Sequence, residues 1–380
     1  MVKSARTLWV PRARIDAMVF RPHRSRSVVA LAVTAILVAA CSGGDDESAT
    51  ESSPPATPTT PTSDPETTTT ERETTTTEEA TTTTEAPPIL YPLTGLEAPD
   101  VLSALRPVVV AKVGNYASHP PSGLNQADIV YEEIINDSIT RFAAAFQSTP
   151  PNDIVGPIRS GRLQDVDLLG SFNAPILAWS GGNRTVTAEI DASDLINLSP
   201  NHCAGSCFRT NFDNAPYNLF FDIPHAWGVG SMQSPGIPPQ QFQYRDDGDP
   251  VGGVPANGVA LKMDSYNVGW TWNASTGLYE RTQQGRSHNL RNGERITTNN
   301  VVVLVMTYLP GISGSPDAQS VGTGEAWVLT GGNLMHGTWT RSDRLQPFTL
   351  TADDGTPILL TPGRSFVELP RAAFGTVTIV

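Results

Sequence analysis

Cysteine is scarce in this chain, with three residues among 380. Cys41 lies near the N-terminus, and Cys203 and Cys207 form a close pair in the stretch NHCAGSCFR. Two thiols and the adjacent His202 are too few ligands for a zinc site, so we expect no metal here. In an oxidising compartment such a pair favours a disulfide, and so short a loop gains only about 2 kcal/mol from closure.

Long hydrophobic runs are also missing. The apolar run VVALAVTAILVAA covers residues 28–40, which is too short to cross a bilayer comfortably but fits the core of a signal peptide. It ends in Val38-Ala39-Ala40-Cys41, the pattern of a bacterial lipobox with Cys41 as the lipidated residue; a plain signal peptide with an incidental cysteine is the alternative. The basic residues before the run are Lys3, Arg6, Arg12, Arg14, Arg21, Arg24 and Arg26.

We therefore expect residues 1–40 to be a lipoprotein signal peptide, with Met18 as an alternative start. Lipid on Cys41 would hold the protein extracytoplasmically, at the outer face of the cytoplasmic membrane. That membrane is the first expected partner.

Residues 41–88 contain almost no large apolar side chain. After Cys41 the stretch carries 11 acidic residues and one basic residue, in runs such as ETTTTERETTTTEEATTTTEAPP. Such a stretch buries too little apolar surface to offset the conformational entropy lost on folding, and its charges repel one another. We expect a disordered tether that holds the following domain away from the membrane.

Basic residues are outnumbered by acidic ones, and the formal net charge is −13. With the leader (+6) and the tether (−10) set aside, the folded region keeps a net charge of about −9. A general nucleic-acid binder carries a basic footprint, so nucleic acid is not an expected partner. Against this acidic background a local arginine cluster stands out.

The remaining residues predict an α+β fold. PVVVAKV, DIVYEEII, ITRFAAAFQ and PILAWS have the β-branched and aromatic content of strands, whereas LQDVDLLGSF, RTVTAEIDASDLI and NAPYNLFFDI are interpreted as helices. After residue 235, closely spaced Asp-Gly and Gly-Gly turns indicate a meandering antiparallel sheet. We expect a mixed-sheet domain with short helices over residues 89–235 and a smaller β-rich domain over 236–380.

A predicted hairpin joins DIVYEEII to ITRFAAAFQ. A three-residue loop would place Glu133 opposite Arg141, and a two-residue loop would place Glu132 there instead. Arg141 shares its face with apolar residues, so it needs a carboxylate partner under either register.

A family resemblance rests on segments that occur in a fixed order. They are RPVVVAKVGN, PPSGLNQADIVYEE, ITRFAAAFQ and VGPIRSGR, followed by NAPYNLF, GTGEAWVL, GTWTR and DDGTPILLTPGRSFVELP. Together they resemble the YerB-like family of bacterial proteins described as lipoproteins. The resemblance implies an α+β domain followed by a smaller β-rich domain, and no established activity.

The same resemblance implies a pair between Glu132 and Arg141, which favours the two-residue loop. Two departures from the family pattern are visible. Asn136-Asp137-Ser138 replaces an acid followed by two glycines, and Pro216-Tyr217-Asn218 replaces Pro-His-Asn. An activity that needed that acid or that histidine would be lost in this chain.

No catalytic residue is identified. Ser160 lacks a nucleophile-elbow pattern, and the histidines have no partner motif. Glu132 and Glu133 point to opposite faces of a strand, which does not suit a glycosidase pair. No zinc-protease, P-loop or dinucleotide motif occurs, and no cofactor is expected.

Binding is the favoured function. Arg159, Ser160 and Arg162 lie in VGPIRSGR, a Gly-Pro turn before a predicted helix, where arginines and backbone N–H groups suit an anion. The predicted ligand is a phosphate or carboxylate of a cell-wall polymer, or an envelope protein. The structural alternative is that these arginines pair with Asp165, Asp167 or Asp128. Alternative functions are an envelope hydrolase and a docking module for wall proteins.

The lipobox leads to a first prediction. Cys41→Ala removes the thiol that lipid would modify, so the variant should be released or remain an unprocessed precursor. Membrane fractionation with a radiolabelled fatty acid measures this. A variant that still fractionates with membranes at wild-type size and with lipid label would contradict the lipobox interpretation.

Overall fold

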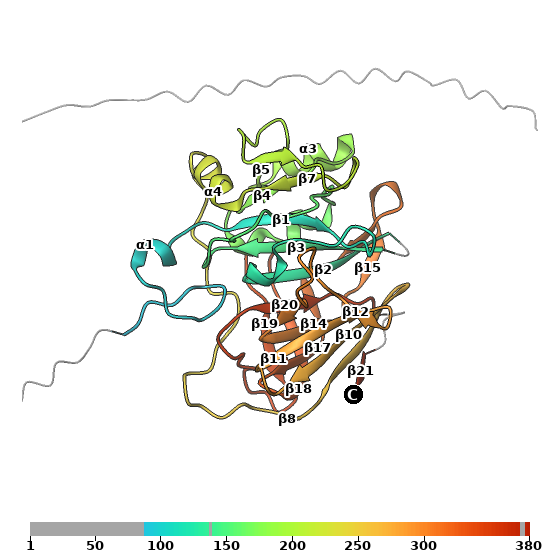
Figure 1. Ribbon diagram of the computed structural model, residues 1–380. Helices are drawn as coiled ribbons and strands as arrows, with labels where there is room; N and C mark the ends of the chain where they lie inside the picture. The colour runs from blue at the N-terminus through green and yellow to red at the C-terminus, as the bar shows by residue number, and fades with distance from the viewer. Residues whose placement is uncertain (1–86, 137–138, 373–376) are drawn as a thin grey trace, which may run out of the picture. The chain divides into compact units, whose positions relative to one another are not determined.

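The computed structural model describes residues 87–136, 139–372 and 377–380 (Figure 1). All of the described residues belong to one compact unit. The predicted signal peptide, Cys41 and nearly all of the predicted tether lie outside the described residues. Within the described part of the chain, no helix is long and apolar enough to cross a membrane.

An eleven-stranded mixed sheet is the largest element. In spatial order its strands are β19 (Thr349–Ala352), β18 (Asn333–Arg341), β17 (Gly322–Thr330), β14 (Asn300–Leu304), β20 (Ser365–Glu368), β2 (Ile129–Asn136), β3 (Ile139–Phe146), β1 (Val109–Gly114), β4 (Ile176–Ala178) and β5 (Ile196–Leu198), with β8 (Val254–Pro255) paired to β18. The predicted mixed sheet is confirmed. The β-branched run that forms β1 is buried along its whole length, as expected of a central strand.

Strand β20 joins the two halves of the chain. It pairs in parallel with β2 on one side and with β14 on the other. The sheet therefore continues across residue 236, where the sequence predicts a domain boundary. Figure 1 shows β20 between the green strands of the N-terminal half and the orange strands of the C-terminal half.

The predicted antiparallel sheets of the C-terminal half are also present. One has six strands, namely β12 (Arg286–Ser287), β11 (Leu278–Gln283), β10 (Tyr266–Asn273), β9 (Gly258–Met263) and β21 (Val377–Ile379), with β13 (Thr297–Thr298) paired to β11. Two small ribbons are β15 (Tyr308–Pro310) with β16 (Pro316–Ala318), and β6 (Cys207–Arg209) with β7 (Leu219–Phe221). Side chains alternate between buried and exposed along β9, so one face packs on the core.

The helices are short. They are α1 (Val101–Ala104), α2 (Gln164–Leu168), α3 (Arg184–Ala192) and α4 (Ile223–Ser231), with 3₁₀ turns η1 (Leu124–Gln126), η2 (Gly170–Phe172) and η3 (Ile312–Gly314). The side chains of Asn183 and Asp222 cap α3 and α4. The helix expected in NAPYNLFFDI is wrong: its continuous apolar run is buried on both faces as β7, and α4 begins only after Asp222.

The β2–β3 hairpin corrects the predicted pairing. Asn136 pairs with Ile139, and an irregularity between Ile134 and Asn136 then places Glu133 opposite Arg141. Glu132 faces the other side of the sheet, opposite Phe142. The expected pair between Glu132 and Arg141 is therefore wrong, because successive side chains on a strand point to opposite faces.

A buried ionic cluster contains Glu132 of β2, Arg281 of β11 and Glu368 of β20, all fully buried. Arg281 Nη2 donates to Glu132 Oε2, and Trp270 Nε1 donates to Glu368 Oε1 at 2.8 Å. Burial raises the pKa of Glu368 well above its usual range, and the charge of Glu132 adds to this. Arg281 is thus balanced chiefly by Glu132, and this bond fastens the second sheet onto the central one.

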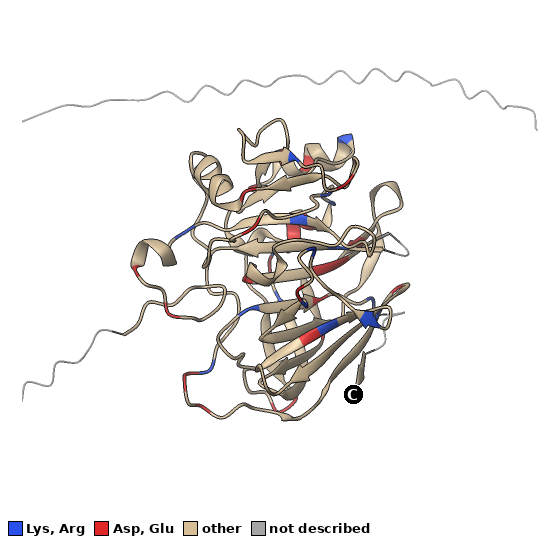
Figure 2. Ribbon diagram, viewed as in Figure 1, with Lys and Arg blue, Asp and Glu red and all other residues tan. Residues whose placement is uncertain are grey.

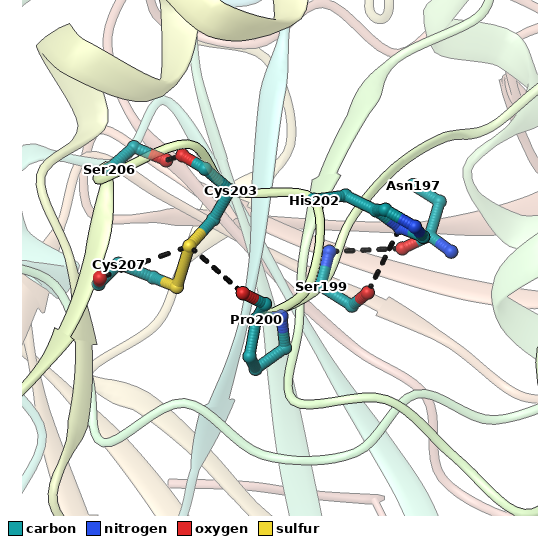
Figure 3. Close-up of a disulfide and its surroundings, with 7 residues drawn as sticks. All are labelled: Asn197, Ser199, Pro200, His202, Cys203, Ser206 and Cys207. Carbon is teal, nitrogen blue, oxygen red and sulfur yellow. Dashed lines mark hydrogen bonds between the residues drawn. A yellow bond between two sulfur atoms is a disulfide. The ribbon is translucent and has the colours of Figure 1, made fainter.

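The predicted disulfide between Cys203 and Cys207 is present (Figure 3). It closes the turn that leads into β6, and Ser206 Oγ donates to the Cys203 carbonyl at 2.6 Å within the same turn. Cys203 is buried and belongs to the hydrophobic core. The disulfide therefore fixes a local turn against the core.

The ionic cluster leads to a stability prediction. Arg281→Met leaves the Glu132 carboxylate buried without its cation, so the free energy of unfolding should fall by about 3–5 kcal/mol. Urea unfolding followed by tryptophan fluorescence measures it. Asp194→Asn is the matched control, since it breaks a partly exposed bond to Arg344 and should cost about 0–1 kcal/mol. Equal losses in the two variants would contradict the role given to Arg281.

Candidate functional site: an arginine corner

The segment around Arg159 is held in place by backbone hydrogen bonds on two sides. Arg159 N–H donates to the carbonyl of Lys112 within β1, and the Arg159 carbonyl accepts from Ser180 N–H. Gly161 N–H donates to the Gly181 carbonyl. These bonds position Arg159, Ser160 and Arg162 beside Arg141 of β3, and we call Arg141, Arg159, Ser160 and Arg162 the arginine corner.

Arg141 is the innermost member of the arginine corner, with 4% of its surface exposed. Its Nη1 donates to the Ser160 carbonyl at 2.7 Å, whereas its Nε is buried without a hydrogen-bond partner. Burial lowers the pKa of Arg141 to about 10, and the charge of Arg162 contributes. The guanidinium is still charged at neutral pH, so its burial is unfavourable unless an anion compensates.

Arg159 lies among aromatic rings. Its guanidinium carbon is 4.8 Å from the centroid of the Tyr217 ring and 5.5 Å from that of Tyr116. Its Nη1 donates to the Pro216 carbonyl at 2.8 Å, and its buried Nε has no partner. Its side chain passes so close to Gly114 that a Cβ there would be 2.9 Å from Arg159 Cγ, which explains the glycine at the end of β1.

Arg162 and Ser160 border a cavity of about 220 Å³. Arg162 Nε donates to Ser315 Oγ at 3.0 Å, and Nη1 donates to the Gly161 carbonyl at 2.8 Å. Asn183, the N-cap of α3, lines the same cavity, so the first turn of that helix opens toward it. Unpaired N–H groups at a helix N-terminus attract anions. Asp317 is the acidic residue in the cavity wall.

The guanidinium groups of the arginine corner have no carboxylate partner. Among the described residues, no acidic oxygen lies within 4.0 Å of a side-chain nitrogen of Arg141, Arg159 or Arg162. Their hydrogen bonds go to backbone carbonyls and one hydroxyl. Basic and acidic residues both occur in each half of the molecule (Figure 2). The lack of a carboxylate partner in the arginine corner is therefore a local feature and does not reflect a shortage of acidic residues.

The aspartates considered as structural partners bond elsewhere. Asp165 Oδ2 accepts from the backbone N–H of Arg162 at 2.7 Å, not from its guanidinium. Asp128 accepts from Ser148 and from the backbone of Gln147, and Asp167 is exposed on α2. Arg162 feels the charge of Asp165, although burial dominates and lowers its pKa.

Three charged residues in the interior lie next to the arginine corner. Lys112 Nζ lies 2.5 Å from Glu133 Oε1 and 2.8 Å from Asp165 Oδ1, and all three side chains are fully buried. Gln164 Nε2 donates to Glu133 Oε2 at 2.6 Å. We call Lys112, Glu133 and Asp165 the buried triad. It lies on the same face of the sheet as Arg141, which is opposite Glu133 in the register.

Tyr116 and Tyr217 belong to the site but were not predicted from the sequence. Tyr217 stands where the family pattern has histidine, and it stacks on His119 with ring centroids 3.9 Å apart. Burial raises the pKa of Tyr116, but the positive charges of Arg141 and Arg159 outweigh it, and the net pKa is lowered. Tyr116 directly follows VVVAKVGN, a predicted strand. Its position just after the end of that strand is the feature of the sequence that could have indicated a place in the site. Glu132, by contrast, belongs to the ionic cluster on the opposite face.

Tyr116 gives a test of this geometry. Arg159→Gln removes one of the charges that stabilise the phenolate, so the pKa of Tyr116 should rise toward its ordinary value. The ultraviolet absorbance of tyrosinate against pH measures it, with Tyr116→Phe identifying the signal. Arg209→Gln, at an exposed site on β6, is the control and should leave the titration unchanged. An unchanged curve in Arg159→Gln would show that the charge does not act on Tyr116.

Two family models match this chain. Residues 93–234 match the N-terminal domain, and residues 259–367 the C-terminal domain, of a family described as protein of unknown function (DUF3048). The two matches follow each other on either side of residue 236 and cover most of the described residues.

One curated relative and one solved structure agree with the family models. The chain is 27% identical over 295 residues to a Bacillus subtilis (strain 168) protein named "Putative lipoprotein YerB", which covers 73% of this chain and 85% of that protein. The crystal structure of YerB from Bacillus subtilis has the same fold, with a TM-score of 0.65 at 20% identity over 76% of this chain and 99% of that one. The chain therefore belongs to the YerB-like, DUF3048 family, as the sequence motifs predicted.

Proposed function

We propose that this protein is a non-catalytic cell-envelope lipoprotein that binds an anionic envelope ligand through the arginine corner. Its location follows from the predicted signal peptide and lipid on Cys41, and a relative carries the name of a lipoprotein. The protein would then be anchored at the outer face of the cytoplasmic membrane, and its tether would let the folded unit reach the wall. The partner class is a phosphate- or carboxylate-bearing wall polymer, or an acidic surface of an envelope protein.

The observation that carries the proposal is that, in the described part of the chain, no carboxylate pairs directly with the guanidinium groups of Arg141, Arg159 and Arg162. Arg141, Arg159 and Arg162 are close enough that Arg162 and Arg159 lower the pKa of Arg141 further, after burial. Like charges that repel one another at a partly buried site reduce stability, so they are expected where a ligand balances them. Guanidinium groups bind phosphate and carboxylate oxygens through two parallel hydrogen bonds.

A hydrolase receives less support from the same geometry. Ser160 Oγ has Ser180 Oγ at 3.5 Å as its side-chain neighbour, and no histidine or carboxylate bonds to it among the described residues. A serine nucleophile needs a base to accept its proton. Ser160 therefore fits a hydrogen-bond donor to an anion better than a nucleophile.

The test is a double replacement, Arg159→Gln with Arg162→Gln. Both side chains are partly exposed, so the melting temperature should change little, while retention of anionic cell-wall fragments should be lost. Co-sedimentation with isolated walls measures binding, and walls stripped of phosphate polymers identify the ligand class. Arg209→Gln with Arg286→Gln makes the same charge change at exposed positions and should bind as the wild type does.

Arg141→Gln provides the stability reference. Removing this buried side chain should destabilise the fold whether or not a ligand binds, because its bond to the Ser160 carbonyl holds the segment. A double variant that melts as early as Arg141→Gln would mean that Arg159 and Arg162 are structural. Retention of wall fragments by the double variant at the level of its control would also contradict the proposal.

A further inference from the structure

Lys112 stands in an unusual position for a lysine. It occupies the middle of β1, a strand buried at every position, and its side chain has no solvent-exposed surface. In the register, Lys112 lies opposite Ala143 of β3, and Ala143 lies opposite Tyr131 of β2. The single methyl group of Ala143 leaves room for the lysine stem to cross β3 toward Glu133. The amine therefore ends between two carboxylates in the interior.

The contacts of the buried triad match those of an acyl-transfer reaction within one chain. Lys112 Nζ is 2.8 Å from Asp165 Oδ1, so the amine touches the carboxyl group that it could attack. Glu133 Oε1 is 2.5 Å from the same nitrogen and can accept its proton. Arg162 N–H donates to Asp165 Oδ2 at 2.7 Å, where negative charge would develop. Holding the reacting groups in contact can lower the activation free energy substantially.

We propose that Lys112 and Asp165 form an intramolecular isopeptide bond, with Glu133 as the catalytic proton carrier. The Glu133 carboxylate takes one proton from the lysine ammonium and passes it to the Asp165 carboxyl group. The freed lone pair on Nζ then forms a bond to Cγ of Asp165. A second amine proton moves through Glu133 to Oδ1, the Cγ–Oδ1 bond breaks, and one water leaves. Glu133 ends in its starting state, and no oxidant, metal or cofactor enters the balance.

Electrostatics in the interior favour this outcome. Burial raises the pKa of Glu133 to about 7, the charge of Asp165 adds to the rise, and Lys112 opposes it. Glu133 can therefore gain and lose a proton near neutral pH. Amide formation also removes one cation and one anion from a fully buried site, where charges are unfavourable. The bond would join β1 to α2, and so fix the support of the arginine corner covalently.

The chain itself supplies an internal control. Its lysines are Lys3 in the leader, Lys112, and Lys262, which is exposed on β9. The full-length protein, purified from membranes and unfolded in guanidinium chloride, is treated with an amine-acetylating reagent, digested, and analysed by tandem mass spectrometry. We expect acetylated Lys262, no acetylated Lys112, and a branched peptide joining Lys112 to Asp165 that is lighter by one water than its two parts.

Glu133→Gln tests the mechanism, since glutamine keeps the shape but cannot carry the proton. In this variant Lys112 should be acetylated and the branched peptide absent, with circular dichroism confirming the fold. Fully acetylated Lys112 in the wild type would overturn the proposal, and this result needs no variant. A branched peptide that persists in Glu133→Gln would overturn the role of Glu133. Neither outcome bears on ligand binding by the arginine corner, so the two proposals are tested separately.

Discussion

The alternation of side chains along β2 governs the chemistry of both halves of this protein. Glu132 and Glu133 are adjacent in the chain, yet one faces Arg281 in the C-terminal half and the other faces Lys112 on β1. Each glutamate is paired with a fully buried cation. A shift of one residue in the register would move each glutamate to the opposite face of the sheet and break its contact with its cation. The irregularity near the hairpin end is therefore what sets the charge balance of the interior.

The arginine corner differs from these two clusters in its lack of acid. Arg281 and Lys112 are paired directly with carboxylates, whereas Arg141, Arg159 and Arg162 bond to carbonyls, to a hydroxyl and to aromatic faces. The two fully buried cations thus have carboxylate partners within the fold, whereas the three arginines of the arginine corner, which are somewhat more exposed, do not. Such a division is expected where the structure is stable alone and binds an anion at one place.

The strands that carry the site could be predicted because β-branched runs identify them locally. Arg159, Ser160 and Arg162 could also be singled out, since charge in a Gly-Pro turn is visible in the sequence. The residue opposite Arg141 in the hairpin could not be predicted, because a one-residue irregularity decides which glutamate occupies that position. Tyr116 and Tyr217 come together from positions about a hundred residues apart, and nothing local to either marks the other. The continuity of the central sheet across both halves could not be predicted either, because the parallel pairing of β20 with β2 and β14 has no local signature in the sequence.

The position of β20 has a consequence for how the chain reaches its native state. Its partner β2 emerges more than two hundred residues earlier, and until Ser365–Glu368 arrives the edge of β2 stays open. Pairings so distant in sequence are slow to form, and open strand edges invite association with other chains. Secretion that delivers the chain from its N-terminus would therefore complete the central sheet only when translocation is nearly finished. The two family domains therefore share one sheet, and a nonsense mutation that removes β20 would leave β2 of the first domain without its partner as well as truncate the second.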